Sequence, residues 1–227
     1  GKAGERNSGL NFSRKQKQVL TWWCAASPAH TCDALICDGA VRSGKTVCMA
    51  LSFLCWATAC FDGAQFGICG KSVSGVRRNV VTAVEPWLRR LGLRWTENRT
   101  EHYLELGCRG RSNRFYLFGG YDEKSAALIQ GITFAGVLLD EAALMPRSFV
   151  EQACARCSVE GARLWFNCNP ESPQHWFYRE WILKAREKNA LHLHFTMEDN
   201  PALSEAVKRR YRTTYSGAFY RRFVLGE

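Results

Sequence analysis

CDGAVRSGKTVC, residues 37–48, lies between two apolar runs and decides the fold. It contains Gly39-x-x-x-x-Gly44-Lys45-Thr46, which matches every fixed position of a phosphate-binding loop. In such loops the glycines let backbone N–H groups turn toward phosphate oxygens at a helix N-terminus, while the lysine reaches the β- and γ-phosphates and the hydroxyl holds Mg²⁺. The stretch predicts a nucleotide site, but it does not say whether the chain is a kinase, a switch or a motor.

The segments around the loop alternate between strand-like and helix-like patterns. A short apolar strand is expected at residues 34–37, before the loop, and an apolar-rich helix at 47–61, after it. Further strands are expected at 64–69, 133–139, 162–170 and 191–196, helices at 13–26, 76–92, 148–157 and 204–215, and a short antiparallel insertion across 93–120. Pro86 is a candidate kink in its helix. Strands separated by helices favour a parallel sheet with helices on both faces.

Composition narrows the class of protein. The chain has 227 residues, enough for one large α/β domain, and its formal charge of +10 fits a polyanionic partner or simple solubility. Most of the 11 cysteines lie in apolar runs, where reduced thiols pack as small hydrophobes, which favours a reducing compartment. The pair Cys154-x-x-Cys157 lacks a second pair at ligand spacing, so a helix face is favoured over a zinc site. No apolar stretch approaches the roughly 20 residues that span a membrane.

Asp140 and Glu141 follow a predicted buried strand in GVLLDE. Nucleotide hydrolysis needs a second magnesium ligand from the end of a strand in the same sheet, and Asp140 fits that role. Glu141 fits a base that orients and deprotonates a water molecule. An Asp-Glu pair alone is a common strand terminus, but a small-molecule kinase does not need a carboxylate on water. The pair, taken with the loop, therefore favours an ATPase.

Two further segments offer polar side chains to the nucleotide. In WFNCNP, Asn167 or Asn169 follows an apolar strand, where either could contact the γ-phosphate or the attacking water; the alternative is an Asn-Pro turn that closes the strand. In FSRKQKQ, Phe12 could stack on adenine while Gln16 or Gln18 bonds its edge. The alternative for this segment is a solvated face of the first helix.

Four motifs, KQKQVLTWW, DGAVRSGKT, LLDEA and NCNPESPQHWFYREW, occur in this order. With this order and spacing the chain resembles the large terminase subunit of tailed bacteriophages and prophages, and YSGAFYRRFVLGE is similar to the end of that family's ATPase module. The resemblance implies an α/β P-loop NTPase of the additional-strand, RecA-like type at residues 12–227, with a mainly parallel sheet, flanking helices and a short antiparallel β addition. A flexible segment is expected at residues 1–11.

The resemblance implies a DNA-packaging motor. A ring of subunits, expected to be a pentamer, would hydrolyse ATP with Mg²⁺ at the portal protein of an empty capsid and drive double-stranded DNA inward. The small terminase subunit is a further expected partner. The isolated domain is expected to be a monomer, and the protein to act in the host bacterial cytoplasm, without a membrane and outside the mature virion. The family's nuclease domain does not fit into these residues, so nuclease activity is not expected.

The matching positions carry the family's roles. Glu141 falls on the catalytic base, Thr46 and Asp140 on the magnesium ligands, and Asn167 and Asn169 on the segment that couples hydrolysis to motion. Gln16 or Gln18 falls on the adenine contact. The phosphate-binding positions are Gly39, Ala40, Val41, Arg42, Ser43, Gly44, Lys45 and Thr46. Lys45 and Arg42 also count as catalytic. Lys45 reaches the β- and γ-phosphates, and Arg42, inside the loop, could touch the γ-phosphate in its own or a neighbouring subunit.

The arginine finger that packaging rings insert into a neighbouring site is a departure from the family. Some relatives carry an Arg-Gly pair shortly before the Asp-Glu strand, and this chain has Gln130-Gly131 there. The candidates that remain are Arg77, Arg78 and Lys124. A solvated helix face is the alternative interpretation of these cations.

DNA contact has two candidate clusters, which are Arg109, Arg111 and Arg114, and Lys208, Arg209, Arg210 and Arg212. A motor that moves any sequence should contact phosphates and ignore base edges, so its binding should weaken with salt. Ordinary surface charge is the alternative for either cluster.

Other functions share the predicted site. A helicase-like DNA translocase would use the same residues, but it would unwind a forked substrate. A nucleotide-dependent switch or assembly module would bind ATP without sustained turnover. A phosphotransferase would transfer the phosphate to an acceptor.

Overall fold

The computed structural model describes residues 11–40, 43–169 and 172–214, together with Gly217, Arg221 and Leu225. The predicted flexible segment at residues 1–11, apart from Asn11, and the predicted loop residues Val41 and Arg42 lie outside the described residues.

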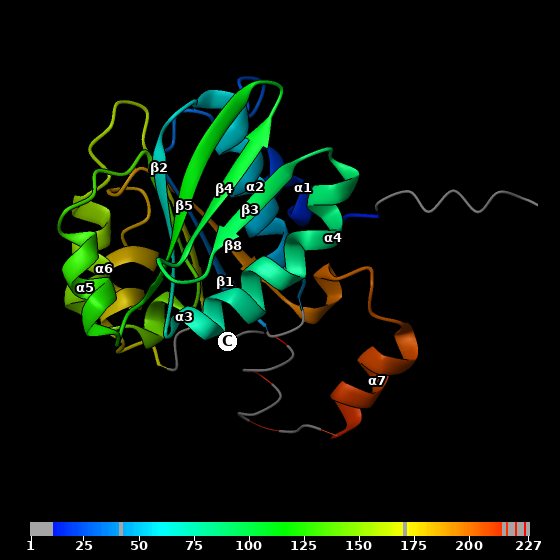
Figure 1. Ribbon diagram of the computed structural model, residues 1–227. Coiled ribbons are helices and arrows are strands. Elements are labelled where there is room, and N and C mark those ends of the chain that lie inside the picture. Colours follow the sequence, from blue (N-terminus) through cyan, green and yellow to red (C-terminus); the bar gives the residue numbers. More distant parts are fainter. Residues whose placement is uncertain are drawn as a thin grey trace, which may run out of the picture.

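One sheet of eight strands organises the domain, in the order β3-β4-β5-β2-β6-β7-β1-β8 (Figure 1). The strands are β1 (Ala34–Gly39), β2 (Gln65–Gly70), β3 (Arg94–Asn98), β4 (Tyr103–Cys108), β5 (Arg111–Gly119), β6 (Gly136–Leu139), β7 (Arg163–Cys168) and β8 (Ala190–Phe195). All neighbours from β5 to β8 along this order pair in parallel, whereas β3, β4 and β5 pair antiparallel. The predicted parallel sheet with an antiparallel addition is confirmed.

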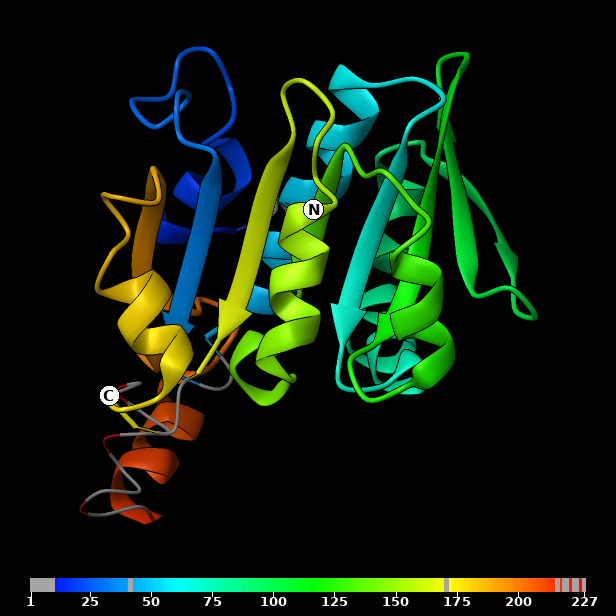
Figure 2. The ribbon, with the colours of Figure 1, turned by 90° about the vertical axis from the view of Figure 1, so that its left-hand side faces the viewer.

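Helices cover both faces of the sheet. They are α1 (Arg14–Thr21), α2 (Lys45–Cys60), α3 (Val73–Val76), α4 (Thr82–Arg90), α5 (Glu123–Ile129), α6 (Arg147–Ala155) and α7 (Glu205–Thr214), with π turns η1 (Arg77–Val81) and η3 (Tyr178–Ile182) and 3₁₀ turns η2 (Ala142–Leu144) and η4 (Met197–Asp199). One hydrophobic core joins the sheet to α1, α2 and α4, and a second joins it to α5, α6 and η3. Figures 1 and 2 show the two groups on opposite sides of the strands.

The first core is built on aromatic side chains. Phe53 and Trp56 of α2 pack on Trp165 of β7 at centroid distances of 5.2 and 4.8 Å. The backbone of β6 comes close to this cluster, because a Cβ atom on Gly136 would lie 2.6 Å from Cζ3 of Trp56. The sheet is thereby held against α2, the helix that follows the phosphate-binding loop.

The predicted helix at 76–92 differs from the structure in an informative way. Helical backbone runs from Val73 to Arg90, but residues 77–81 form a π turn. Pro86 lies inside α4 without ending it. The helix begins earlier than predicted because Ser72 caps it, accepting a hydrogen bond from Gly75 N–H at 3.0 Å. The short helix α5 and the π turn η3 were not predicted.

The N-terminal helix begins where the sequence predicts but ends at Thr21, short of the predicted residue 26. Ser13 is the N-cap of α1 and forms a reciprocal capping box with Gln16. Among the described residues no helix is long and apolar enough to cross a membrane.

Candidate functional site

The phosphate-binding loop joins β1 to α2, and close contacts require its glycines. A Cβ atom on Gly39, where φ is 123°, would lie 2.0 Å from the carbonyl oxygen of Phe195 on β8. Ala40 N–H donates to that same oxygen at 2.9 Å. Gly44 caps α2 with a φ of 78°, and a Cβ atom there would lie 2.4 Å from Nε2 of Gln16. The loop therefore leads into a helix N-terminus, where N–H groups attract phosphate oxygens.

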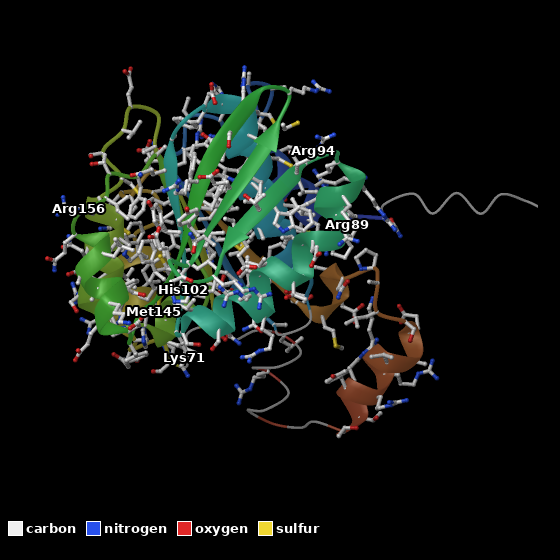
Figure 3. All side chains as sticks on the ribbon, in the orientation of Figure 1. Lys71, Arg89, Arg94, His102, Met145 and Arg156 are labelled. Atoms are coloured by element: carbon white, nitrogen blue, oxygen red, sulfur yellow. The ribbon has the colours of Figure 1, made fainter. Side chains whose placement is uncertain are left out.

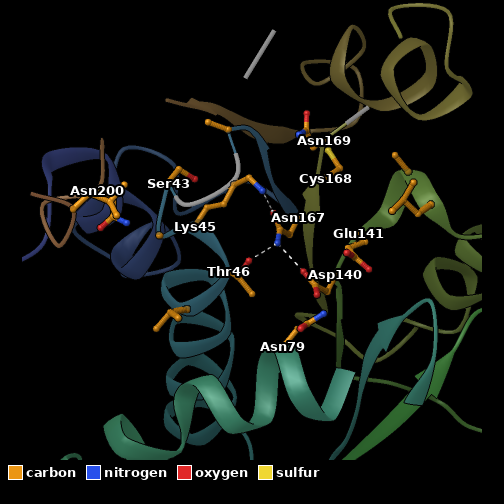
Figure 4. Close-up of a pocket in the computed structure, with 16 residues that line it drawn as sticks. Ser43, Lys45, Thr46, Asn79, Asp140, Glu141, Asn167, Cys168, Asn169 and Asn200 are labelled. Atoms are coloured by element: carbon orange, nitrogen blue, oxygen red, sulfur yellow. Dashed lines mark hydrogen bonds between the residues drawn. The ribbon is translucent and has the colours of Figure 1, made fainter. Parts of the chain in front are cut away.

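Asn167 connects this loop to the acidic pair. Lys45 Nζ donates to Oδ1 of Asn167 at 2.7 Å, and Nδ2 of Asn167 donates to Oγ1 of Thr46 at 2.9 Å and to Oδ1 of Asp140 at 2.7 Å (Figure 4). Lys45 is 9% exposed and Asp140 is 5% exposed. A buried cation and a buried anion are thus joined through a neutral amide. They meet because β1, β6 and β7 are parallel and end at one edge of the sheet.

The acidic pair has an unusual environment and backbone. Burial raises the pKa of Asp140 above its ordinary value, and the hydrogen bond from Asn167 opposes this rise. Glu141 has φ 55° and ψ 45°, in the left-handed region, which costs a non-glycine residue about 1–2 kcal/mol. Backbone strain of this kind occurs at functional sites, where the surrounding structure enforces it. Here it directs Glu141 into the cleft beside Asp140 (Figure 4).

These groups line a cleft of about 630 Å³. Its lining consists of Ala40, Ser43, Gly44, Lys45, Thr46, Val47, Asn79, Asp140, Glu141, Ala143, Leu144, Asn167, Cys168, Asn169, Asn200 and Leu203. Burial raises the pKa of the Cys168 thiol well above its ordinary value, so this cysteine is an inert part of the wall.

The donor set fits Mg²⁺. Oγ1 of Thr46 and Oδ1 of Asp140 both contact the same nitrogen of Asn167, so the two oxygens converge on one point. Mg²⁺ prefers oxygen ligands and is usually held by one or two protein oxygens plus substrate phosphates. In the described part of the chain, no group of three or more His, Cys, Asp or Glu residues is placed to hold a metal ion by itself.

The predicted adenine contacts lie outside the cleft lining. Phe12 packs against Trp87 with ring centroids 5.6 Å apart, and Gln18 is exposed on α1. Gln16 is buried, and both ends of its amide are bonded within the chain. Its Oε1 accepts from Ser13 N–H at 3.0 Å, and its Nε2 donates to the carbonyl of Ser43 at 3.4 Å. Gln16 therefore supports the loop, and the adenine contact stays a prediction.

The candidate finger residues also lie outside the cleft lining. Nε of Arg77 donates to Oε1 of Glu97 on β3 at 2.5 Å, which ties this side chain to its own domain. Arg78 and Lys124 are exposed.

The structure separates the predicted DNA contacts by their partners. Arg114 pairs with Glu105 at 2.6 Å, and Lys208 and Arg212 both pair with Glu198 and Glu205. Arg209 and Arg210 are exposed on α7. Arg109 and Arg111 line a hollow of about 560 Å³ together with Arg94, and none of the described residues that line it is acidic.

Several residues of the site carry no sequence signal. Asn79 reaches the cleft from η1, and Asn200 and Leu203 reach it from the segment after η4. Asp38, just before the loop, is held by two histidines of β8, with Nε2 of His192 2.5 Å and Nδ1 of His194 3.1 Å from its carboxylate oxygens. The alternation of LHLHFT places both histidines on one face of the strand, but only the pairing of β8 with β1 brings them to Asp38.

The phosphate-binding loop follows β1 and the acidic pair follows β6, and β7 lies between these two strands in the sheet. This arrangement defines a P-loop domain of the additional-strand class. Residues 36–227 match the family model of the terminase large subunit, T4likevirus-type, N-terminal. The chain therefore belongs to the large terminase subunits of phages, and residues 36–227 match the N-terminal part of that subunit.

Solved structures agree with this assignment. The large terminase of a thermophilic bacteriophage is 53% identical with a TM-score of 0.94, covering 96% of this chain and 54% of that one. The same terminase in complex with ADP gives 52% identity and a TM-score of 0.91, covering 96% and 53%. This chain thus spans about half the length of that relative. None of the curated proteins matches it.

More distant structures share the fold. The ATPase domain of the Thermus phage P74-26 large terminase is 17% identical with a TM-score of 0.66, covering 87% of this chain and 89% of that one. The HK97 bacteriophage large terminase is 15% identical with a TM-score of 0.67, covering 96% and 51%.

Proposed function

We propose that this domain hydrolyses ATP and uses the energy to move double-stranded DNA into an empty capsid. The observation that carries the proposal is the convergence of Lys45, Thr46 and Asp140 on one amide, with Glu141 beside them in the cleft. The half-identical terminase of the thermophilic bacteriophage, solved with ADP and with ATP-γ-S, supports a nucleotide as the ligand of this cleft.

Each residue has a physical role in this proposal. The phosphates bind over the N-terminus of α2, and Lys45 leaves Asn167 for the β- and γ-oxygens. Thr46 and Asp140 would hold Mg²⁺, which would offset the charge that develops on the phosphates. Glu141 accepts a proton from the attacking water. Its left-handed backbone fixes the carboxylate in the cleft before the substrate arrives.

The exchange of Glu141 for glutamine tests the hydrolysis. Glu141→Gln keeps the shape of the side chain but cannot take the proton, so we expect phosphate release to fall by a factor of about 100 or more while ATP-γ-S still binds. Glu151→Gln, on the exposed face of α6, is the matched control. Undiminished turnover in Glu141→Gln would refute the assignment of the base.

DNA contact is best supported at the hollow lined by Arg94, Arg109 and Arg111. Arg109 has a φ of 50° at the tip of the β4–β5 hairpin, where a glycine or asparagine would be relaxed. Arg111 is held by its NH1 group on the carbonyl of Ala59 at 2.5 Å. A strained arginine and two neighbouring cations, in a hollow whose described lining holds no acid, suit a phosphate backbone. Figure 3 shows Arg94 at this end of the molecule, away from Lys71 at the opposite end.

Salt dependence tests the DNA contact. Each phosphate contact contributes about −0.9 to the slope of log K against log salt. Replacing Arg94, Arg109 and Arg111 by alanine in one variant should make the slope shallower by about 2–3. Replacing Arg209 and Arg210 by alanine should change the slope less. A slope that changes only when Arg209 and Arg210 are replaced would show that α7, and not the hollow, contacts DNA.

A forked duplex tests the helicase-like alternative, because unwinding of this substrate would favour it.

The remaining partners follow from the family. The subunits are expected to form a pentameric ring on the portal protein. In that ring each subunit would supply a cation to the site of its neighbour. The small terminase subunit would be a further partner, and the assembly would act in the host bacterial cytoplasm. Arg78 and Lys124 are the exposed candidates for that cation. If the ATPase rate per subunit stays constant as concentration rises and on adding portal or DNA, assembly does not complete the site.

A further inference from the structure

Asn79 reaches the nucleotide cleft from a helix that no motif marks. It lies in the π turn η1, and Figure 4 shows its side-chain amide directed toward Asp140. Among the described residues this amide makes no hydrogen bond with the protein. An amide offers both donors and an acceptor, so Asn79 is ready to contact a ligand from two sides.

The start of this helix is fixed against the sheet. A Cβ atom on Gly119, at the end of β5, would lie 2.9 Å from Cα of Ser72, the cap of α3. A Cβ atom on Gly70, at the end of β2, would lie 2.7 Å from Cγ2 of Val76. Because two glycines let the helix approach the strand ends so closely, its position relative to Asp140 is set by these two contacts.

The π turn sets the direction of Asn79. Its i→i+5 bonding adds one residue to the turn, and Oγ1 of Thr82 donates to the carbonyl of Arg77 at 3.1 Å across it. Val76 and Val80 face the core, which leaves Asn79 at the edge of the buried face, toward the cleft. Such turns are frequent at functional sites.

We infer that Asn79 positions the attacking water, an inference that rests on the proposed hydrolysis. The water oxygen forms a bond to the γ-phosphorus as Glu141 takes one proton. The bond from the γ-phosphorus to the bridging oxygen breaks, and its electron pair leaves with ADP. Oδ1 of Asn79 accepts a hydrogen bond from the second hydrogen of the water, and Nδ2 donates to a γ-phosphate oxygen. Asn79 exchanges no proton.

Asn167 is less suited to this task in the nucleotide-free protein. Its oxygen accepts from Lys45, and its nitrogen donates to Thr46 and to Asp140. Within the described part of the cleft, Asn79 is the amide whose hydrogen-bonding groups face the acidic pair without a protein partner.

The test compares turnover with binding. Asn79→Ala should lower kcat by about 10–100-fold and leave the Kd for ATP-γ-S within about twofold of wild type, because it removes orientation and little affinity. Asn79→Asp keeps the shape but places a third negative charge beside two carboxylates. Like charges disfavour ionisation, so the acidic limb of its pH–rate profile should move to higher pH, whereas Asn79→Ala should show no such shift.

Thr82→Ala is the control, because it removes one side-chain hydrogen bond of the π turn but keeps the backbone bond from Thr82 N–H to the carbonyl of Arg77, and so leaves the Asn79 amide in place. It should retain turnover close to wild type. Equal losses in Thr82→Ala and Asn79→Ala, or unchanged kcat in Asn79→Ala with an active wild type, would overturn the positioning role. A wild-type chain without phosphate release would overturn the proposed hydrolysis and this inference together.

Discussion

Removing the Asn167 amide should destabilise the nucleotide-free domain far more than the nucleotide-bound one. Asn167→Ala deletes three hydrogen bonds, two of them to the buried charges of Lys45 and Asp140. Hydrogen bonds to charged groups contribute about 1.5–3 kcal/mol each, and water recovers part of the loss, so we expect unfolding to become easier by about 2–4 kcal/mol. In the proposed Mg-nucleotide complex, phosphates and Mg²⁺ replace the amide as partners.

Urea unfolding with and without Mg-ADP measures this difference. The mutation should lower the free energy of unfolding less in the nucleotide-bound domain than in the nucleotide-free domain. By linkage, each 1.4 kcal/mol of this difference appears as about tenfold tighter nucleotide binding. Asn113→Ala is the matched control, since Asn113 is similarly buried and also makes three hydrogen bonds, but only with backbone groups: Ala64 N–H at 3.0 Å and the carbonyls of Phe61 at 3.0 Å and Ala57 at 3.4 Å. Its loss should be the same in both states. An Asn167→Ala loss below about 1 kcal/mol, or one that Mg-ADP leaves unchanged, would refute the bridging role.

Three further changes test the fold and the site. Because burial raises the pKa of Asp140, the folded state holds the Asp140 proton more readily than the unfolded chain, and stability falls as pH rises and this proton is lost. Asp140→Asn should therefore stabilise the nucleotide-free domain at pH 7 but not below about pH 4, as measured by urea titration. Gly136→Ala should cost about 1–3 kcal/mol by pressing a methyl group against Trp56, while Gly131→Ala, with its nearest neighbour at 3.7 Å, should be close to neutral in the same assay. Ser13→Ala should cost about 1 kcal/mol by removing the capping box of α1, and an unchanged denaturation midpoint would contradict that cap.

The sequence predicted those parts of the site whose signals are local. A strand, a glycine loop and a helix stand next to each other at residues 34–60, and Asp140 and Asn167 each follow an apolar strand, so parallel pairing alone brings them together. The bridging geometry of Asn167 was not predictable, because it depends on how far β7 extends between its two neighbours.

Asn79 was not predictable for a different reason. Val76, Val80, Val84 and Leu88 recur every fourth residue, a spacing that an ordinary α-helix also satisfies. The apolar pattern therefore hides the extra residue of the π turn, and with it the direction of Asn79. Gln16 shows a different limit, because its sequence does not reveal that its amide caps α1 and supports Ser43, while its predicted contact with adenine stays a prediction.

The two proposed working ends of the motor are joined by a single strand. β5 begins at Arg111 beside the arginine hollow and ends at Gly119 against Ser72, the residue that starts the helix carrying Asn79. Nine residues at about 3.3 Å each span roughly 30 Å. Because β5 pairs with β4 on one side and β2 on the other, it cannot stretch without breaking both ladders. A load on DNA at the hollow would therefore reach the far end of β5 as a displacement of the whole strand, and there Gly119 lies against Ser72, which starts the helix that carries Asn79 into the cleft.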